Sequence, residues 1–401
     1  MEQQEKFDES EIRLIAKTIF GLEEILVAEL RKLGARDVEL LNRAVKFTGD
    51  KGMIYKANLC LRTALRVLIP VAQFDVQDEK SFYEGIKKID WEKFIDVSDS
   101  IAIDTVLNTD LFTHTQFISQ KAKDAIVDQF REKYDKRPDV NLDRPVLRLN
   151  IHIFENTCSI ALDSSGDSLH KRGYRDQTNL APLNEVLAAG LVLLTGWDRA
   201  RNLVDPMCGS GTILTEAAMF TANIPPGYYR AEFGFMHWKK FLAYDESLYN
   251  TIYEAMIARI SSEPASIFGG ELSHNVARKA KENVKLARVE DLVQIRESDI
   301  SDFIPPDGGG VLIMNPPYGE RMDKDDIFLL YKKIGDAFKQ HFSGYDCWLI
   351  TSNMEALKHV GLRASRKIKI FNGPLECRFV KYEMYRGTKK LHKLKEIPEA
   401  E

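Results

Sequence analysis

The chain has 401 residues, with 56 Lys and Arg against 60 Asp and Glu and a formal net charge of −4. This near-balance excludes a uniformly basic nucleic-acid-binding protein, although charge can be segregated onto one face. The length favours two to three domains, each able to bury its own core.

Short strands and helices alternate over roughly the first 160 residues. Residues 12–34 predict a strand followed by an amphipathic helix, and residues 37–47 predict alternating strands. We expect helices at 53–68 and 116–133 and a hairpin at 146–162. This α+β mixture is too short and too interrupted to form a nucleotide-binding sheet.

A short apolar strand ending at Asp205 leads into a glycine-rich loop and then into a helix of small residues. Gly209 and Gly211 allow close backbone approach, and the helix N-terminus favours an anionic group such as a carboxylate. The acid precedes the glycines, which differs from the dinucleotide-binding motif and favours a ligand with an amino group. No Gly-Lys-Ser/Thr follows, so the pattern is not a P-loop either. We predict a cofactor site made of Asp205, Pro206, Cys208, Gly209, Gly211 and Thr212.

Two further acids end the next two predicted strands. Glu271 closes a strand at 266–271, and a carboxylate at this position usually holds ribose hydroxyls. Asp299 closes the following strand, where it can meet an adenine amino group. The aromatic-rich stretch at about 221–264 is expected to be an insertion.

The apolar run at 311–314 predicts a buried strand, and Asn315, Pro316, Pro317 and Tyr318 follow at its carboxyl end, where open α/β sheets place their chemistry. The side-chain oxygen of Asn315 and the carbonyl of Pro316 can accept both N–H groups of an exocyclic amine. Gripping both hydrogens directs the nitrogen lone pair at an electrophile. Tyr318 offers a stacking surface for the base, so we predict that these four residues are catalytic.

The ordered set of strand-end residues resembles the class I S-adenosylmethionine-dependent methyltransferases that methylate amines, over about residues 165–386. Leu-His-Lys-Arg-Gly-Tyr-Arg at 169–175 and the hairpin at 371–378 narrow the resemblance to THUMP-containing RNA methyltransferases of the RlmL family, over nearly the whole chain. The resemblance implies an α/β fold: a Rossmann-like class I methyltransferase domain preceded by an α+β ferredoxin-like/THUMP RNA-binding region.

The resemblance also implies a cofactor and its contacts. The cofactor would be S-adenosylmethionine, with the glycine loop around its methionine part, Glu271 on the ribose and Asp299 on the adenine. Arg172, Tyr174 and Arg175 would order either the cofactor pocket or the RNA backbone, and the sequence does not separate these two roles. The family usually has Asp where Glu271 stands and Lys where Asn184 stands.

For the domains we expect a ferredoxin-like part at 1–45, a THUMP region at 46–160 and a methyltransferase domain at 161–401. RNA phosphates are expected to contact basic residues on both sides of the domain boundary. The candidates are Arg62, Arg66, Lys121, Lys123, Arg131, Arg175 and Arg321. For any single one, a solvated helix face explains the charge as well.

The resulting hypothesis is methylation of the N2 amine of a guanine in RNA, with 23S rRNA favoured as partner. tRNA guanine-N2 methylation, adenine-N6 methylation and a non-catalytic RNA-binding assembly factor stay open as alternatives. Five scattered cysteines and eight histidines show no ligand spacing, so we expect no metal and a reducing compartment. The apolar stretch at 187–194 is too short to span a bilayer and no signal peptide is visible, so a cytoplasmic location is expected.

Overall fold

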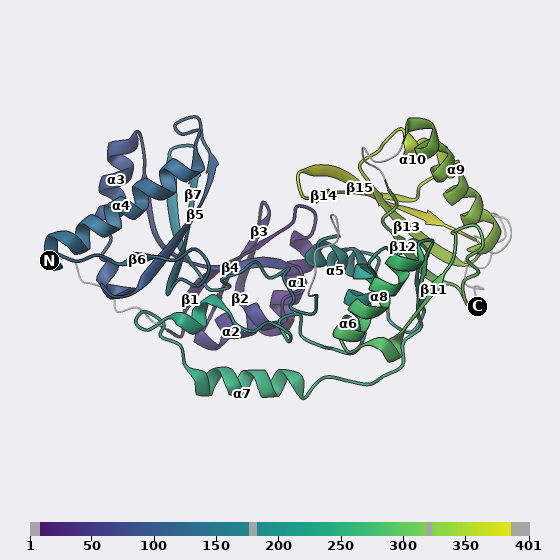
Figure 1. The fold of residues 1–401 in the computed structure, drawn as a ribbon, viewed down its shortest axis with the longest axis horizontal. Coiled ribbons are helices and arrows are strands. Elements are labelled where there is room, and N and C mark those ends of the chain that lie inside the picture. Colours follow the sequence, from purple (N-terminus) through teal and green to yellow (C-terminus); the bar gives the residue numbers. More distant parts are fainter. Residues whose placement is uncertain (1–8, 176–182, 318–322, 386–401) are drawn as a thin grey trace, which may run out of the picture. The chain divides into compact units, whose positions relative to one another are not determined.

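The computed structural model of the protein describes residues 9–175, 183–317 and 323–385. The chain folds into two compact units, each with its own sheet (Figure 1). The first unit holds the described chain up to Thr18 together with Leu26–Lys171 and Arg230–Met256. The second holds Ile19–Ile25, Arg172–Tyr229 and the chain from Ile257 onward.

The first unit is built on an eight-stranded sheet with the order β2-β3-β1-β4-β8-β7-β5-β6. Strand β4 joins the two halves of this sheet, because its residues 64–68 pair with β1 and its residues 68–75 pair with β8. The strands are β1 (Ile12–Thr18), β2 (Arg36–Leu41), β3 (Ala44–Gly49), β4 (Ala64–Asp75), β5 (Ser100–Asn108), β6 (Asp139–Val140), β7 (Leu147–Phe154) and β8 (Thr157–Asp163).

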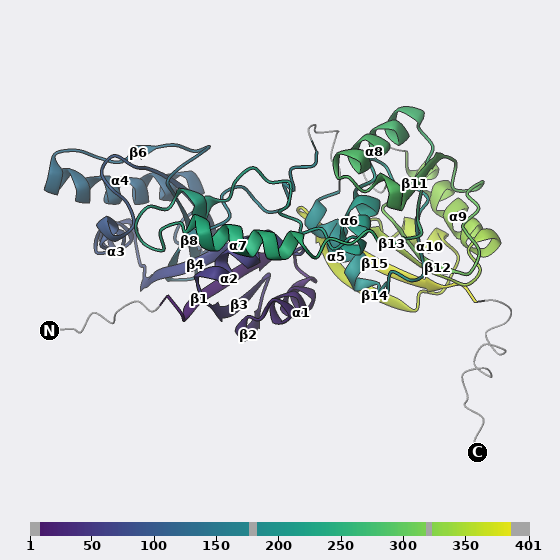
Figure 2. The ribbon, with the colours of Figure 1, turned by 90° about the horizontal axis from the view of Figure 1, so that it is seen from below.

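Amphipathic helices bury their apolar stripes against this sheet in a core that includes Leu26, Ile54, Phe82 and Ile126. In Figures 1 and 2, α3 and α4 lie together beside the half of the sheet that contains β5 and β7. The helices in this part of the chain are α1 (Glu23–Leu33), α2 (Lys51–Cys60), α3 (Glu79–Lys87), α4 (Thr115–Tyr134) and the 3₁₀ turn Trp91–Lys93.

The helix expected at 53–68 is shorter than the sequence predicts. It begins two residues earlier, at Lys51, where Asp50 caps the amide of Met53, and it ends at Cys60. Residues from Ala64 onward form β4 instead. The apolar spacing does continue past Cys60, but the β-branched residues Val67 and Ile69 pair better on a pleated surface, so the expected helix is wrong beyond residue 60.

Part of the stretch expected to be an insertion packs in the first unit. Residues Arg230–Met256, which carry the 3₁₀ turn Gly234–His237 and most of α7 (Glu246–Ile257), belong to that unit. Tyr55 on α2 is the centre of the contact: its ring centroid lies 4.6 Å from Phe235 and 5.9 Å from Tyr249. The Tyr55 hydroxyl also accepts a hydrogen bond of 3.0 Å from the amide of Asp245. Aromatic burial of this kind fixes the segment firmly.

The second unit contains a seven-stranded sheet with the order β11-β10-β9-β12-β13-β15-β14. The first five strands are parallel, and β15 is antiparallel to both of its neighbours. The chain order reverses between β9 and β12, which is the switch point where open α/β sheets bind ligands. The strands are β9 (Asn202–Asp205), β10 (Ile267–Glu271), β11 (Val293–Glu297), β12 (Gly310–Met314), β13 (Tyr345–Thr351), β14 (Arg366–Asn372) and β15 (Leu375–Glu383).

Helices lie in the crossover connections between the parallel strands, as such connections require. These are α6 (Thr212–Thr221), α8 (His274–Leu286) with the 3₁₀ turn Glu290–Leu292, and α9 (Lys324–His341). Helix α5 (Glu185–Leu194) precedes β9, and the short α10 (Ala356–His359) follows β13. The expected fold class is confirmed: a Rossmann-like sheet follows a separate α+β region.

Candidate cofactor and substrate site

The loop after β9 has the conformation that a close backbone approach requires. Gly209 and Gly211 adopt φ values of +54° and +79°, which L side chains rarely adopt. A Cβ on Gly211 would also lie 3.2 Å from the Cβ of Ala280 on α8. Thr212 then begins α6, so the first amides of this helix lack intrahelical partners and face back towards the glycine loop.

Asp205 ends β9 and is 1% exposed. Its Oδ1 accepts a hydrogen bond of 3.1 Å from the amide of Met207, and no Lys, Arg or His in the described part of the chain pairs with it. Burial, together with the nearby charge of Glu271, raises the pKa of Asp205 to about 8. A buried carboxyl of this kind is well suited to a cationic ligand, which would restore its charge.

Glu271 ends β10 and contacts the same loop. Its Oε2 accepts from the amide of Gly209 at 3.1 Å, and its Oε1 accepts from the amide of Ser273 at 2.9 Å. The amide of Cys208 donates to the carbonyl of Gly270 at 2.9 Å. The structure therefore brings the predicted loop residues and Glu271 together at one edge of the sheet.

Pro206 and Cys208 are close-packed parts of this loop. The carbonyl of Pro206 would lie 3.2 Å from a Cβ placed on Gly270, and Cys208 Sγ would lie 3.3 Å from one on Gly269. The Cys208 side chain is 7% exposed, and burial raises the pKa of its thiol well above the usual range. Cys208 thus fills space beneath the loop as a neutral thiol.

Asp299 lies two residues beyond the end of β11 and is engaged by a residue that sequence reasoning missed. Lys333 on α9 donates to Asp299 Oδ2 at 2.8 Å, and the amide of Ser301 donates to Oδ1 at 2.8 Å. Burial acts to raise the pKa of Asp299, but the Lys333 ammonium and the Ser301 amide outweigh it and lower the pKa. An adenine amino group would share this carboxylate with Lys333.

Asn315 is the first residue after β12. Its Oδ1 is buried and accepts no hydrogen bond from the described residues. A buried acceptor that stays unpaired lowers the stability of the fold by about 1–3 kcal/mol, and a donor from a bound ligand would remove this loss. Pro316 is buried and Pro317 is exposed. The predicted residues Tyr318 and Arg321 lie outside the described residues.

The structure places Arg172 and Tyr174 against α6. Arg172 Nε lies 3.2 Å from Glu216 Oε1, and the Tyr174 hydroxyl lies 3.3 Å from the same oxygen. The side chains of Arg172 and Glu216 are 1% and 0% exposed. Burial and the charge of Glu216 raise the pKa of Tyr174 well above its usual value. These side chains hold the helix that follows the glycine loop.

Arg175 also contacts α6, at its first residue. Its guanidinium donates to Thr212 Oγ1 and lies 3.3 Å from Glu185 on α5. Asn184 is the N-cap of α5, since its Oδ1 accepts from the amides of Val186 and Leu187 at 2.9 and 3.2 Å.

The other basic candidates have partners inside the chain. Arg62 is 7% exposed, so a phosphate would reach it only after rearrangement. Arg66 pairs with Asp163 and donates to the carbonyl of Gly166 at 2.7 Å. The remaining pairs are Lys121 with Glu79, Lys123 with Asp124 at 2.7 Å and Arg131 with Asp128 at 3.5 Å.

Sequence reasoning missed Glu216, Glu185 and Lys333 as site residues. An acid within an otherwise apolar helix was a usable signal for Glu216, because a buried carboxylate needs a cationic partner. No comparable signal marks Lys333, which lies among other charged residues of α9. Within the described ranges, no group of three potential metal ligands is found, and no helix there has the length and hydropathy to cross a membrane.

Comparisons with known proteins agree with this architecture. Residues 13–68 match the RlmL ferredoxin-like domain, residues 76–163 the THUMP domain and residues 172–381 the methyltransferase domain of RMKL-like proteins. The ribosomal RNA large subunit methyltransferase K/L of Syntrophotalea carbinolica is 38% identical over 386 residues, which cover 93% of this chain and 54% of that protein. The chain therefore spans about half the length of that relative.

A candidate RNA methyltransferase of Synechocystis is 36% identical over 367 residues, covering 91% of this chain and 95% of that protein. The crystal structure of SMU.472, a candidate methyltransferase complexed with SAH, superimposes with a TM-score of 0.83 at 28% identity, covering 94% of this chain and all of that chain. With the loop after β9, the strand-end acids and three matched domains in place, the chain belongs to the RMKL-like methyltransferase family.

Proposed function

We propose that this protein transfers a methyl group from S-adenosylmethionine to the N2 amine of a guanine in RNA, with 23S rRNA as the favoured substrate. The observation that carries the proposal is the buried Oδ1 of Asn315 at the end of β12, which accepts no hydrogen bond from the described residues. A buried acceptor at the switch point of the sheet has a physical reason to exist if a substrate amine donates to it.

The residues around the β9 loop fit the cofactor. Asp205 suits the ammonium group of the methionine part, and the amides that begin α6 suit its carboxylate. Glu271 can accept from ribose hydroxyls, because each carboxylate oxygen has a second lone pair beside its bond to Gly209 or Ser273. When bound, S-adenosylmethionine supplies an electrophilic methyl group. The SAH in a relative of the same fold supports this assignment.

Asn315 and Pro316 would act on the acceptor amine. Their two oxygens accept its two N–H groups, which removes the nitrogen lone pair from conjugation with the ring and fixes its direction. The new N–C bond then forms as the methyl group leaves its sulfur, and the amine loses one proton to solvent. Because no side chain has to take that proton in the same step, the catalytic effect rests on geometry.

RNA as the substrate rests on the N-terminal region. The THUMP match at 76–163 and a relative named as a ribosomal RNA large subunit methyltransferase support RNA over DNA, and the latter favours 23S rRNA over tRNA. The two acceptor oxygens of Asn315 and Pro316 could equally bind the N6 amine of adenine, so the identity of the modified base has to be assayed directly.

The experiment is a methylation assay with RNA from a host strain that lacks the gene. Purified protein and labelled S-adenosylmethionine are incubated with 23S rRNA, 16S rRNA and tRNA, and the labelled nucleosides are identified by mass spectrometry. N2-methylguanosine in 23S rRNA is the expected product. Label in tRNA would overturn the substrate, N6-methyladenosine would overturn the base, and absence of label from every RNA would favour a binding factor.

A further inference from the structure

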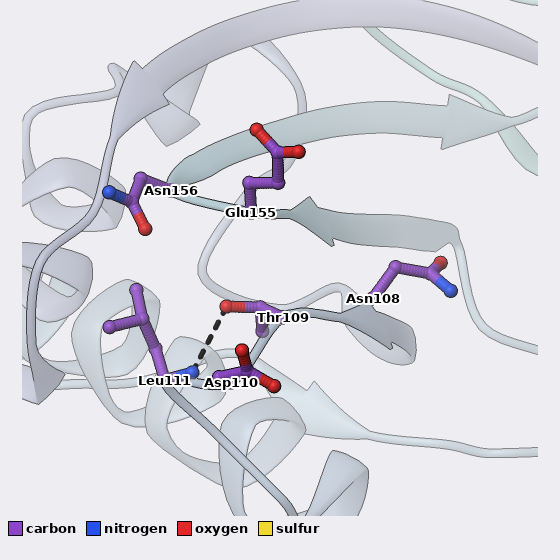
Figure 3. Close-up of a pocket in the computed structure, with 6 residues that line it drawn as sticks. All are labelled: Asn108, Thr109, Asp110, Leu111, Glu155 and Asn156. Carbon is purple, nitrogen blue, oxygen red and sulfur yellow. Dashed lines mark hydrogen bonds between the residues drawn. The ribbon is translucent and has the colours of Figure 1, made fainter.

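One carboxylate of the second unit is held far more firmly than other acids on loops of the chain. Asp110 and Glu155 line a hollow of about 290 Å³ in the first unit, where Figure 3 shows them among amide and hydroxyl groups. Both residues are exposed, so water can satisfy their carboxylates. The side chain of Asp299 is only 24% exposed, and other parts of the chain bond both of its oxygens.

The backbone around Asp299 is fixed by its own turn, residues 298–302. The amide of Ser298 donates to the carbonyl of Glu271 at 3.1 Å, which joins this turn to the end of β10. The carbonyl of Asp299 accepts from the amide of Asp302 at 3.1 Å and from the hydroxyl of Ser298 at 3.0 Å. Oδ1 of the Asp299 side chain accepts from the amide of Ser301 at 2.8 Å. These bonds fix the turn and leave Oδ2 to a partner from elsewhere.

Lys333 of α9 is that partner. Its Nζ donates to Oδ2 at 2.8 Å, and among the described residues it is the one side chain from outside the turn that bonds this carboxylate. The acid three residues further along the same helix, Asp336, pairs with Lys339 instead. The adjacent Lys332 is exposed and forms no ion pair with the described residues. Lys333 therefore makes a specific contact across 34 positions of the chain rather than a local pair along its helix.

This contact limits what Asp299 can accept. Each carboxylate oxygen has two lone pairs, and Ser301 and Lys333 each use one of them. The lone pairs that remain have fixed directions, which suits an N–H donor such as the 6-amino group of adenine. An oxygen at that position of the purine would instead set one lone pair against another. A carboxylate that is held at both oxygens cannot turn away from such a ligand, so the mismatch weakens binding.

We propose that Lys333 is a positioning residue that sets the selectivity of the cofactor site for a 6-aminopurine, by holding the carboxylate of Asp299 in one orientation. The inference rests on the expected placement of the adenine amino group at Asp299, which belongs to the proposed function. Without Lys333 the carboxylate would be held at one oxygen only. The last torsion of an Asp side chain has broad energy minima, so the group could then turn away from an unsuitable ligand.

Isothermal titration calorimetry with two ligands, the full-length chain and no RNA tests the inference. One ligand is S-adenosylhomocysteine, and the other is S-inosylhomocysteine, in which an oxygen replaces the 6-amino group. In the wild type, the Kd for the inosyl ligand should be higher by about tenfold to a hundredfold, the range for losing a hydrogen bond to a charged group. Lys333→Met removes the ammonium and should lower this ratio of Kd values by at least about fivefold. Lys333→Arg keeps a charged donor and should keep most of the ratio.

Lys332→Met is the matched control, because it removes the same charge from the neighbouring, exposed position of α9. It should leave the ratio unchanged, and thermal melting should show that all the variants fold. A wild-type ratio in Lys333→Met would overturn the inference. A ratio higher than that of the wild type would also contradict it, because Lys333 would then be competing with the adenine amine for Asp299.

Measurements at pH 6.5 and pH 8 separate positioning from a change in ionisation. If Lys333→Met acted only by letting Asp299 take up a proton, the ratio would recover as the pH rises, and the inference would be wrong. A ratio that stays low at both pH values supports positioning. Any effect of pH on Asp205 cancels, because the ratio compares two ligands that share the methionine part.

Asp299→Ala separates this inference from the placement of the cofactor. If Asp299→Ala lowers the ratio and Lys333→Met does not, the adenine amine lies at Asp299 and the inference about Lys333 falls alone. If Asp299→Ala keeps the wild-type ratio, the placement and the inference fall together. A wild type that methylates no RNA would overturn the proposed reaction, while the binding ratios would still decide the role of Lys333.

Discussion

The backbone amide of Gly209 donates to Glu271 Oε2 over 3.1 Å, so the loop after β9 and the end of β10 are bonded directly to each other. The carboxylate thereby fixes the position of a glycine that has no side chain to hold it. In the proposed function the same carboxylate, which holds the loop through Gly209, would also present a lone pair to the ribose.

Removing this carboxylate should weaken cofactor binding. Glu271→Ala is expected to raise the Kd for S-adenosylmethionine by about tenfold to a hundredfold, the range for losing a hydrogen bond to a charged group. Isothermal titration calorimetry measures it. Glu290→Ala changes an exposed acid outside the loop and is the control. Equal affinities for the two variants would show that Glu271 neither orders the loop nor contacts the ligand.

Cofactor affinity should depend on pH through Asp205. Because the pKa of this buried carboxyl is raised to about 8, it is largely protonated at neutral pH and must lose a proton to face an ammonium ligand. The Kd for S-adenosylmethionine should therefore fall as pH rises from 6 to 8, by up to about tenfold per unit. Asp205→Asn should bind more weakly and lose this dependence. A Kd that is flat between pH 6 and 8 in the wild type would refute the assignment.

The same carboxyl should make the ligand-free protein less stable at high pH. A folded-state pKa raised above the unfolded value contributes stability below about pH 4, and that contribution is lost as pH rises through about 8. Asp205→Asn removes this cost and should stabilise the ligand-free protein at pH 8, on the order of 1–4 kcal/mol. Thermal melting at pH 5 and pH 8 measures the effect. A variant less stable than wild type at pH 8 would argue against a costly buried charge.

The pair formed by Arg172 and Glu216 should be sensitive to single substitutions. Glu216→Gln removes the carboxylate that faces a 1% exposed guanidinium, which should destabilise the second unit by about 3–5 kcal/mol. Replacing both residues together, Arg172→Met with Glu216→Leu, should restore much of that stability because no buried charge is left. Denaturant unfolding of the variants compares them. A double variant at least as unstable as Glu216→Gln would contradict this account.

Much of the second unit could be predicted from sequence because the candidate site residues lie at or just after the ends of strands. The strand ends at Asp205, Glu271 and Met314 are visible as apolar runs that stop at a polar residue or a proline. Parallel pairing then brings those ends to one edge, whatever the details of packing. At these strand ends, the local sequence pattern is enough to predict where the residues lie in the folded sheet.

Other features depend on contacts that a local pattern does not contain. The aromatic residues around Phe235 indicate burial, but nothing near them indicates that their partner is Tyr55, 180 positions earlier. Long-range contacts also explain why α2 ends at Cys60. The residues after it fit a helix locally, but pairing of β4 with β1 and β8 makes them a strand. Arg62 was expected to contact an RNA phosphate, but its side chain is 7% exposed, and no local pattern around it indicates this burial.

The most direct test of the central claim is single-turnover methylation of RNA by Asn315→Ala, measured beside its Kd for S-adenosylmethionine. If the buried Oδ1 of Asn315 grips the acceptor amine, the rate should fall by about a hundredfold to a thousandfold, as when one preorganised group is removed from a transition state. The Kd for the cofactor should stay within about twofold of the wild type, since the residue directly follows β12 and is not in the β9 loop. A variant that methylates RNA at a near-normal rate would contradict the account.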